Sequence, residues 1–331
     1  MEGVGGVNDF WAGLRVFVTG ATGMIGSWLV KELLVNGASV SALVRDSDPQ
    51  SELFRSGDFR KISLINGTLD EFSEVERAIN QYEVDTVFHL GAQALVGVAH
   101  RSPLPTFETN IRGTYNLLEA CRIHRTFVKR VVIASSDKEY GEQPRLPYTE
   151  DLPLNGRHPY EVSKSCADLI AQTYHHTYDL NVAIARCGNV YGGGDLNWSR
   201  IVPGTIRSFC MGERPLIRSD GNYVRDYIYV KDVARAYMRI AECLQNDRVK
   251  GEAFNFSCEK PMTVLEMVEA IRKLMDCEHI LPDIRNISEG EIGSQYLIAA
   301  KARTSLSWRP EFALEDGLHE TIKWYRTYLG V

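Results

Sequence analysis

The stretch Arg15-Val-Phe-Val-Thr-Gly-Ala-Thr-Gly-Met-Ile-Gly26 decides the fold of this 331-residue chain. Its first five residues are mostly β-branched or aromatic, which is typical of a short buried strand. Gly20, Gly23 and Gly26 then have the spacing of a tight turn that leads from a strand into a helix. Such a turn presents the free N–H groups of the helix to a pyrophosphate. The stretch therefore predicts a dinucleotide site, and a glycine-rich turn without a ligand is the alternative.

The first half of the chain alternates short apolar runs with helical patterns. This alternation is typical of a parallel sheet with helices on both faces. The predicted strands are Arg15–Thr19, Ser39–Val44, Lys61–Ile65, Thr86–Leu90, Arg130–Ala134 and Asn181–Ala185. The predicted helices are Ser27–Val35, Glu74–Asn80, Thr106–His124 and Tyr160–Tyr178. We therefore expect an α/β fold with a Rossmann-type, doubly wound parallel sheet.

The pattern changes beyond about residue 190, where turn-rich segments appear and helices become the main recurring element. Helices are predicted over Val230–Leu244, Val264–Met275 and Leu314–Tyr328. We expect a dinucleotide-binding domain over residues 1–190 and a smaller C-terminal substrate-binding lobe over residues 191–331. Residues 227–257 are predicted to return to the main sheet.

Composition excludes several classes of protein. The net charge of −6 argues against binding to a nucleic-acid backbone. No apolar run approaches the ~18–20 residues that a membrane span requires, and Met1–Asp9 lacks the pattern of a signal peptide. The seven cysteines include no Cys-x-x-Cys pair, which favours a reducing cytoplasm, and no metal site is expected.

Two Tyr-x-x-x-Lys matches occur, and their context separates them. Tyr160 follows Pro159 at the start of a helical pattern, so Tyr160 and Lys164 are predicted to share one helix face. An ammonium group beside a phenol is expected to lower the pKa of that phenol, which helps it to accept a hydroxyl proton. Tyr227 and Lys231 lie in or next to a β-like run, so we interpret that match as structural.

A polar cluster, Ser135-Ser-Asp-Lys138, directly follows the fifth predicted strand. Ligands bind outside the carboxyl ends of parallel strands, so this is where chemistry is expected. The alternative is a polar loop in which Asp137 caps a helix.

Together these motifs resemble the extended short-chain dehydrogenase/reductase family, whose members are nucleotide-sugar epimerases and dehydratases. The resemblance is closest to its CDP-glucose 4,6-dehydratase branch. It rests on the glycine motif, Ala92-Gln-Ala-Leu-Val96, Ser136-Asp-Lys138, His158-Pro-Tyr-Glu-Val-Ser-Lys164, Gly188-Asn-Val-Tyr-Gly-Gly-Gly-Asp195 and Arg200-Ile-Val-Pro203. It covers most of the chain to about residue 240 and then fades to generic features.

The resemblance implies roles for particular residues. The catalytic residues would be Ser136, Asp137, Lys138, Tyr160 and Lys164. Those at NAD or NADP would be Gly20, Thr22, Gly23, Met24, Ile25, Gly26, Arg45, Leu69, Leu90, Ala92, Tyr160 and Lys164. Those at the nucleotide-sugar substrate would be Gln93, Asn189, Arg200 and Arg225.

Three positions depart from the family pattern and leave questions open. Val44, followed by Arg45, stands where an acidic residue often holds the adenosine ribose, and Arg45 could instead pair with the 2′-phosphate of NADP. Thr68 replaces the acid that often meets adenine. Glu139 adds a carboxylate, so either Lys138 or Glu139 could act as a base, and Lys138 could instead remain charged and stabilise an enolate.

We expect a 4,6-dehydratase that recycles its cofactor, because Asp137 and Lys138 are surplus to the chemistry of a 4-epimerase. The epimerase and a non-catalytic cofactor-binding protein are the alternatives. Thr106–His124 and Tyr160–Tyr178 carry apolar residues on more than one face (Leu117, Leu118, Ile123; Leu169, Ile170, Tyr174), which favours a homodimer or homotetramer.

Overall fold

A seven-stranded, wholly parallel sheet forms the centre of the computed structural model, which describes residues 10–287 and 292–331. The strand order is β11-β6-β5-β4-β1-β2-β3, so it reverses direction between β1 and β4. The strands are β1 (Arg15–Thr19), β2 (Ser39–Val44), β3 (Ser63–Asn66), β4 (Thr86–His89), β5 (Arg130–Ser136), β6 (Val182–Cys187) and β11 (Ala253–Phe256). The predicted Rossmann-type sheet is confirmed, and a ligand crevice is expected where the order reverses.

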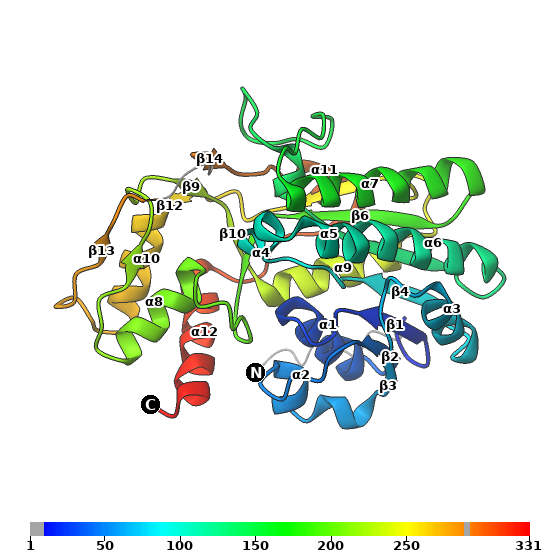
Figure 1. Ribbon diagram of the computed structural model, residues 1–331, viewed down its shortest axis with the longest axis horizontal. Helices are drawn as coiled ribbons and strands as arrows, with labels where there is room; N and C mark the ends of the chain where they lie inside the picture. The colour runs from blue at the N-terminus through cyan, green and yellow to red at the C-terminus, as the bar shows by residue number, and fades with distance from the viewer. Residues whose placement is uncertain (1–9, 288–291) are drawn as a thin grey trace.

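Helices cover both faces of this sheet (Figure 1). One face packs against α1 (Met24–Val35), α9 (Val230–Cys243) and α11 (Ala300–Leu306). The other packs against α3 (Phe72–Gln81), α6 (Gly113–Ile123) and α7 (Pro159–Tyr178). Every residue of β4 and β6 is buried, as expected for strands covered on both sides.

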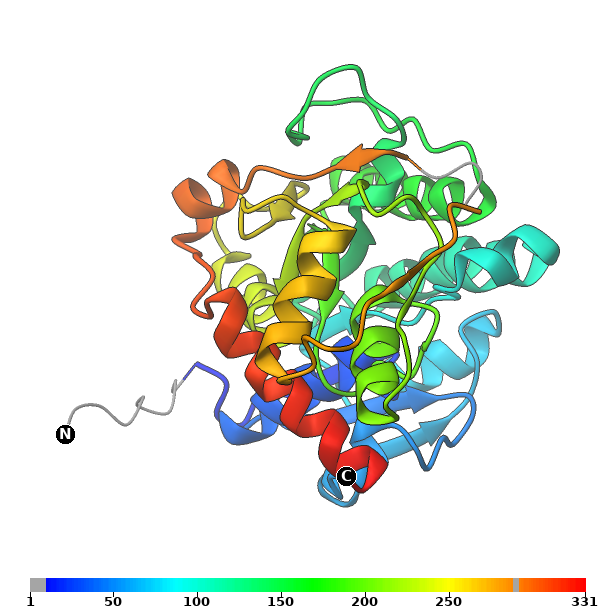
Figure 2. The ribbon, with the colours of Figure 1, turned by 90° about the vertical axis from the view of Figure 1, so that its left-hand side faces the viewer.

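A second lobe lies at the carboxyl edge of the sheet (Figure 2). Its core is made by α8 (Ile201–Cys210), α10 (Val264–Leu274) and α12 (Leu314–Leu329). One strand pair and one three-stranded sheet complete it: β8 (Leu216–Ile217) with β13 (Asp283–Ile284), and β9 (Val224–Arg225) with β12 (Met262–Thr263) and β14 (Ser294–Gln295). A further pair, β7 (Asn189–Tyr191) with β10 (Tyr227–Tyr229), joins this lobe to the sheet domain.

Several predicted elements differ from the structure by one to three residues at their ends, and one predicted helix is interrupted. The helix predicted over Thr106–His124 is interrupted: α5 (Pro103–Phe107) is followed by a π-helical turn, Glu108–Arg112, before α6 begins. That turn aims the side chain of Asn110 at Gln93 and Ser163, a tertiary contact that helical periodicity cannot reveal.

The third predicted strand begins two residues later than expected, at Ser63, because Asp58–Lys61 forms a 3-10 turn. Two short helices, α2 (Glu52–Arg55) and α4 (Val96–Arg101), complete the sheet domain. Within residues 10–287 and 292–331, no helix is both long and apolar enough to cross a membrane.

Candidate active site

The carboxyl end of β5 carries the predicted catalytic loop. Ser136 ends the strand, and a 3-10 turn, η3 (Asp137–Tyr140), follows at once. The Ser136 hydroxyl accepts a hydrogen bond from the backbone N–H of Lys138 at 3.2 Å and so caps this turn. Asp137 is almost fully buried, and the Lys138 ammonium lies 3.3 Å from its Oδ1 atom. Asp137 and Lys138 therefore form a largely desolvated acid–base pair.

The first turns of α7 bring Tyr160 and Lys164 to the carboxyl end of β5. The helix begins cleanly because the Glu161 carboxylate accepts hydrogen bonds from the backbone N–H groups of Arg157 and His158, at 2.8 and 3.2 Å. The Lys164 ammonium donates to the backbone carbonyl of Ala134 in β5. The helix is thereby fastened to the strand that carries Ser136.

The acidity of Tyr160 differs from the expectation. Burial raises its pKa to about 12, while the Arg200 cation and a hydrogen bond with Ser136 act in the opposite direction. Burial also lowers the pKa of Lys164 to about 8. The expectation that the pKa of Tyr160 is lowered is therefore wrong, because desolvation outweighs the effect of the neighbouring Arg200 cation.

The second Tyr-x-x-x-Lys match is divided between two elements. Tyr227 lies in β10, whereas Lys231 lies in the first turn of α9 and forms an ion pair with Glu320 at 2.5 Å. The strand that holds Tyr227 therefore ends at Tyr229, and the helix begins at Val230, as predicted. Lys231 is occupied by a structural partner, in line with our interpretation of this match.

The glycine turn fits a pyrophosphate. Gly20 has a φ of +73°, and a Cβ atom there would lie 2.7 Å from the backbone of Leu90 and Gly91. A Cβ atom at Gly26 would lie 2.1 Å from the Gly20 carbonyl oxygen. Gly23 precedes α1 without a side-chain cap, so the first N–H groups of the helix are available to an anion.

The remaining predicted cofactor residues border the same edge of the sheet. Thr22 lies in the turn, Leu90 and Ala92 follow β4, and Leu69 follows β3 with its side chain against Gly91 and Gly113. The buried Thr68 Oγ1 atom has no hydrogen-bond partner among the described residues.

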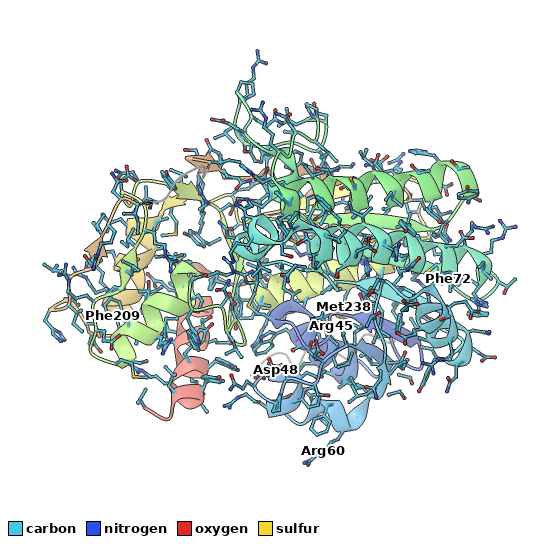
Figure 3. The ribbon with its side chains drawn as sticks, in the orientation of Figure 1. Arg45, Asp48, Arg60, Phe72, Phe209 and Met238 are labelled. Atoms are coloured by element: carbon cyan, nitrogen blue, oxygen red, sulfur yellow. The ribbon has the colours of Figure 1, made fainter. Side chains whose placement is uncertain are left out.

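Arg45 directly follows β2 and is largely exposed (Figure 3). Its Nε atom lies 2.7 Å from the carboxylate of Asp46. That carboxylate would repel a 2′-phosphate placed beside Arg45.

A cavity of about 710 Å³ opens between the two lobes. Residues from both the cofactor side and the substrate side line it: Met24, Ile25, Ser136, Asp137, Lys138, Tyr160, Asn189, Arg200 and Arg225. Arg200 immediately precedes α8 and lies 3.0 Å from Asp195, and Arg225 lies on β9. The cavity thus places cationic side chains within reach of a substrate that faces the catalytic loop.

The structure adds detail to the substrate side. The side-chain oxygen of Gln93 accepts a hydrogen bond from the backbone N–H of Leu95 at 3.0 Å, and its proposed contact with the substrate stays a prediction. Arg218 and Tyr223, which the sequence did not single out, also line the cavity. Gln295 contacts the catalytic loop from β14. Neither Arg218 nor Gln295 belongs to a motif that would have indicated it.

Glu139 is not available as a catalytic base. It is fully buried and lies 2.5 Å from Arg186, which also pairs with Asp168 at 2.9 Å. Burial and the neighbouring Asp168 raise the pKa of Glu139 well above its usual range. Glu139 therefore belongs to a structural network behind β5.

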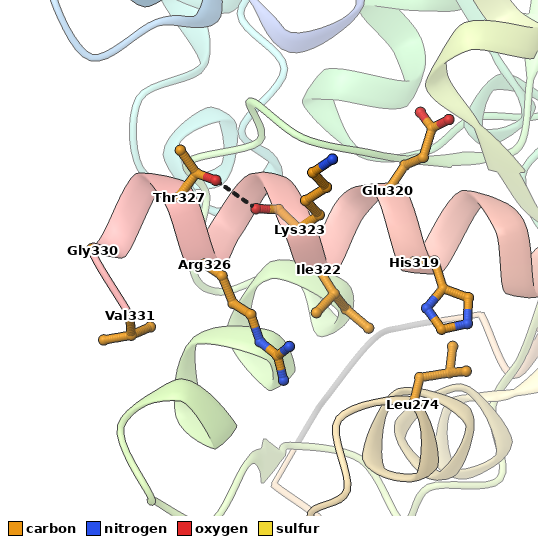
Figure 4. Close-up of a pocket in the computed structure, with 9 residues that line it drawn as sticks. All are labelled: Leu274, His319, Glu320, Ile322, Lys323, Arg326, Thr327, Gly330 and Val331. Carbon is orange, nitrogen blue, oxygen red and sulfur yellow. Dashed lines mark hydrogen bonds between the residues drawn. The ribbon is translucent and has the colours of Figure 1, made fainter.

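A second hollow, of about 630 Å³, lies between α10 and α12 (Figure 4). Its lining includes Leu274, His319, Lys323 and Arg326 but no residue of the predicted catalytic set. Of these two cavities, the one between the lobes is lined by Ser136, Asp137, Lys138 and Tyr160 of the predicted catalytic set.

Comparisons with known proteins identify a family. A sequence model of the NAD dependent epimerase/dehydratase family matches residues 16–256. The CDP-glucose 4,6-dehydratase of Salmonella typhimurium is 31% identical, over 97% of this chain and 93% of its own.

Solved structures include both reaction types. The UDP-glucose 4-epimerase of Thermotoga maritima, with UDP-glucose, has a TM-score of 0.87 and 27% identity over 96% of this chain and 100% of its own. The dTDP-glucose 4,6-dehydratase of Bacillus anthracis, in complex with NAD, has a TM-score of 0.84 and 26% identity over 95% of this chain and 97% of its own.

Proposed function

Because the chain belongs to the NAD-dependent epimerase/dehydratase family, we propose that it is a nucleotide-sugar 4,6-dehydratase. The observation that carries this proposal is the pairing of Asp137 with Lys138 in the same cavity as Tyr160. Elimination of water requires an acid and a base in addition to the group that accepts the C4 hydroxyl proton. The Asp137–Lys138 pair would supply both.

In the proposed first step, Tyr160 accepts the proton of the sugar C4 hydroxyl, and Ser136 hydrogen-bonds the reacting oxygen. Lys164 orients the cofactor ribose and contributes positive charge. A nicotinamide cofactor held by the glycine turn and Lys164 would supply the redox chemistry, as a reservoir for the hydride that leaves C4 and later returns at C6. The resulting C4 ketone makes the C5 hydrogen acidic.

Asp137 and Lys138 would then act as two ends of one proton-transfer pair. The ion pair and the neutral pair differ only in which partner holds one proton, and desolvation disfavours two separated charges. In the neutral form, Lys138 removes the C5 proton while Asp137 protonates the departing C6 hydroxyl, which leaves as water. The pair is left as an ion pair, and transfer of one proton from Lys138 to Asp137 restores the neutral form. Once the hydride has returned to C6, the C5 atom would take up the one proton that Tyr160 accepted from the C4 hydroxyl, which returns Tyr160 to its starting state and closes the proton balance.

The charge environment of Lys138 supports its role as a base. Burial lowers its pKa, and the Arg225 cation acts in the same direction, whereas Asp137 and Glu161 oppose them. A lowered pKa brings the neutral amine closer to working pH than for an exposed lysine.

We propose that Arg200, Arg225 and Asn189 bind the substrate diphosphate, and that CDP-glucose is the preferred substrate. The test is to incubate the purified protein with NAD and CDP-, dTDP-, UDP- and GDP-glucose, and to follow the alkali-induced absorbance of 4-keto sugars. A 4-keto-6-deoxy product is expected. The second candidate, a 4-epimerase, is favoured by the similarity to the Thermotoga enzyme and predicts C4 epimers without that product.

We further propose that the recycled cofactor is NAD, because Asp46 already neutralises Arg45. Wild-type protein is expected to bind NAD more tightly than NADP. Replacing Arg45 with alanine is expected to change the Kd for NAD by less than about fivefold, since exposed ion pairs contribute little. Calorimetric titration with both cofactors tests this. Tighter binding of NADP that is lost in Arg45→Ala would contradict it.

We also propose a dimer formed by α6 and α7. Leu117 and Leu118 are buried in the protein's own core, so they do not contribute, but Ile123 and Leu169 are 48% and 54% exposed. Large apolar side chains on adjacent helices favour a partner subunit. Leu169→Glu is expected to convert the dimer to a monomer in light scattering at micromolar concentration, with Leu281→Glu, a similarly exposed leucine in the second lobe, as the control. A monomeric wild type would refute the proposal.

The chain's described cysteines are all free thiols. This agrees with the cytoplasmic location that we propose.

A further inference from the structure

A glutamine from the C-terminal lobe holds the catalytic loop. Gln295 lies on β14, is only 1% exposed, and is separated from Lys138 by 157 residues. Its Oε1 atom accepts a hydrogen bond from the Lys138 Nζ atom. Its Nε2 atom donates to the backbone carbonyl of Asp137 at 3.0 Å. One side chain therefore contacts both members of the proposed acid–base pair.

These contacts fix the direction of the Lys138 amine. Because the Nε2 group is committed to the Asp137 carbonyl, the acceptor oxygen of Gln295 faces Lys138. The same Nζ atom donates a second hydrogen bond, to Oδ1 of Asp137, at 3.3 Å. Two of the three free directions on nitrogen are thus taken by protein acceptors. The third direction on the nitrogen faces the cavity that Lys138 lines. In the neutral amine, the lone pair occupies this direction.

Gln295 provides this orientation without adding a charge. The charges that act on Lys138 come from Asp137 on its own turn, Arg225 on β9 and Glu161 on α7. Gln295 is in register with Arg225 in the β9–β14 pair, so its backbone is held by the strand that carries that cation. A carboxylate at position 295 would stabilise the ammonium form of Lys138 and oppose its action as a base.

We propose that Gln295 is a positioning residue that directs the Lys138 amine toward the substrate C5 atom and keeps its surroundings uncharged on that side. This inference rests on the proposed role of Lys138. It adds a group outside the sequence motifs to the machinery of elimination.

Two nearly isosteric variants test the proposal. Gln295→Met removes the acceptor, so the ammonium loses stabilisation and the pH at which kcat declines on the alkaline side should fall. Gln295→Glu adds a negative charge, so that decline should move to higher pH, by about one unit. In both variants kcat should drop about 10- to 100-fold with little change in KM. Ser294→Ala, an exposed neighbour on the same strand, is the matched control.

A second measurement does not depend on turnover. NMR titration of 13Cε-labelled lysine, with the Lys138 signal assigned from Lys138→Met, should show its pKa lower in Gln295→Met and higher in Gln295→Glu. Unchanged values, or shifts in the same direction, would overturn the proposal. If Gln295→Met does not fold, the direction of the shift in Gln295→Glu decides. Wild type that forms no 4-keto-6-deoxy sugar would refute the proposed function alone, while the titration would still decide whether Gln295 controls Lys138.

Discussion

Replacing Tyr160 with phenylalanine is expected to lower kcat by at least about 10³-fold, because the group that accepts the C4 hydroxyl proton is lost. The aromatic ring would remain in place, so binding of the cofactor and of the sugar should change little. Burial raises the pKa of Tyr160 to about 12, and Arg200 and Ser136 are the protein groups that act against this rise. Without the hydroxyl oxygen, oxidation at C4 cannot begin, and every later step stops with it.

Single-turnover absorbance of the reduced cofactor is the measurement for this prediction. Tyr160→Phe should show no reduction, whereas Tyr82→Phe, at the end of α3 and away from the cavity, should match wild type. Calorimetric binding of NAD should be retained in both variants, which separates lost chemistry from lost structure. Cofactor reduction by Tyr160→Phe at a rate within tenfold of wild type would show that another group takes the proton.

Much of the sheet domain could be predicted from the sequence because its signals are local. The strands predicted over Arg15–Thr19 and Ser39–Val44 have the observed bounds, since each is a compact apolar run that ends at turn residues. The interruption of the helix predicted over Thr106–His124 could not be foreseen. The π-helical turn there serves the contacts of Asn110 with residues on other elements.

The candidate site divides in the same way. Ser136, Asp137, Lys138 and Tyr160 belong to short motifs, and all four line one cavity. Gln295 could not be predicted because its contact with Lys138 joins residues far apart in sequence. The direction of the Tyr160 pKa was also predicted wrongly, since it depends on burial, which is set by the packing of the whole site.

The second prediction with a large expected effect on the rate concerns the Asp137–Lys138 pair, because this pair distinguishes dehydration from epimerisation. Asp137→Asn keeps the size of the side chain but removes the proton that the departing C6 hydroxyl requires. Oxidation at C4 should survive, while dehydration should slow by about 10²–10⁴-fold, the usual contribution of a general acid. Lys138→Met should slow dehydration to a similar extent by removing the base.

The change of kcat for dehydration with rising pH should also have opposite signs in wild type and in Asp137→Asn. In wild type the working pair holds one proton, so kcat falls when rising pH removes it, and the lowered pKa of Lys138 places this decline below that of an ordinary lysine. In Asp137→Asn only the neutral amine is needed, so the residual rate should rise through the same range.

Exchange of the C5 hydrogen with solvent deuterium separates the two roles. Asp137→Asn should continue to exchange this hydrogen in the 4-keto intermediate, because Lys138 still removes the proton while water loss is blocked. Lys138→Met should reduce the cofactor but should not exchange C5, because no base remains to open that bond. If Asp137→Asn dehydrates the sugar at the wild-type rate, Asp137 is not the general acid. If Lys138→Met exchanges the C5 hydrogen at the wild-type rate, Lys138 is not the base. Because each variant leaves the Tyr160 step intact, either result can be attributed to elimination itself.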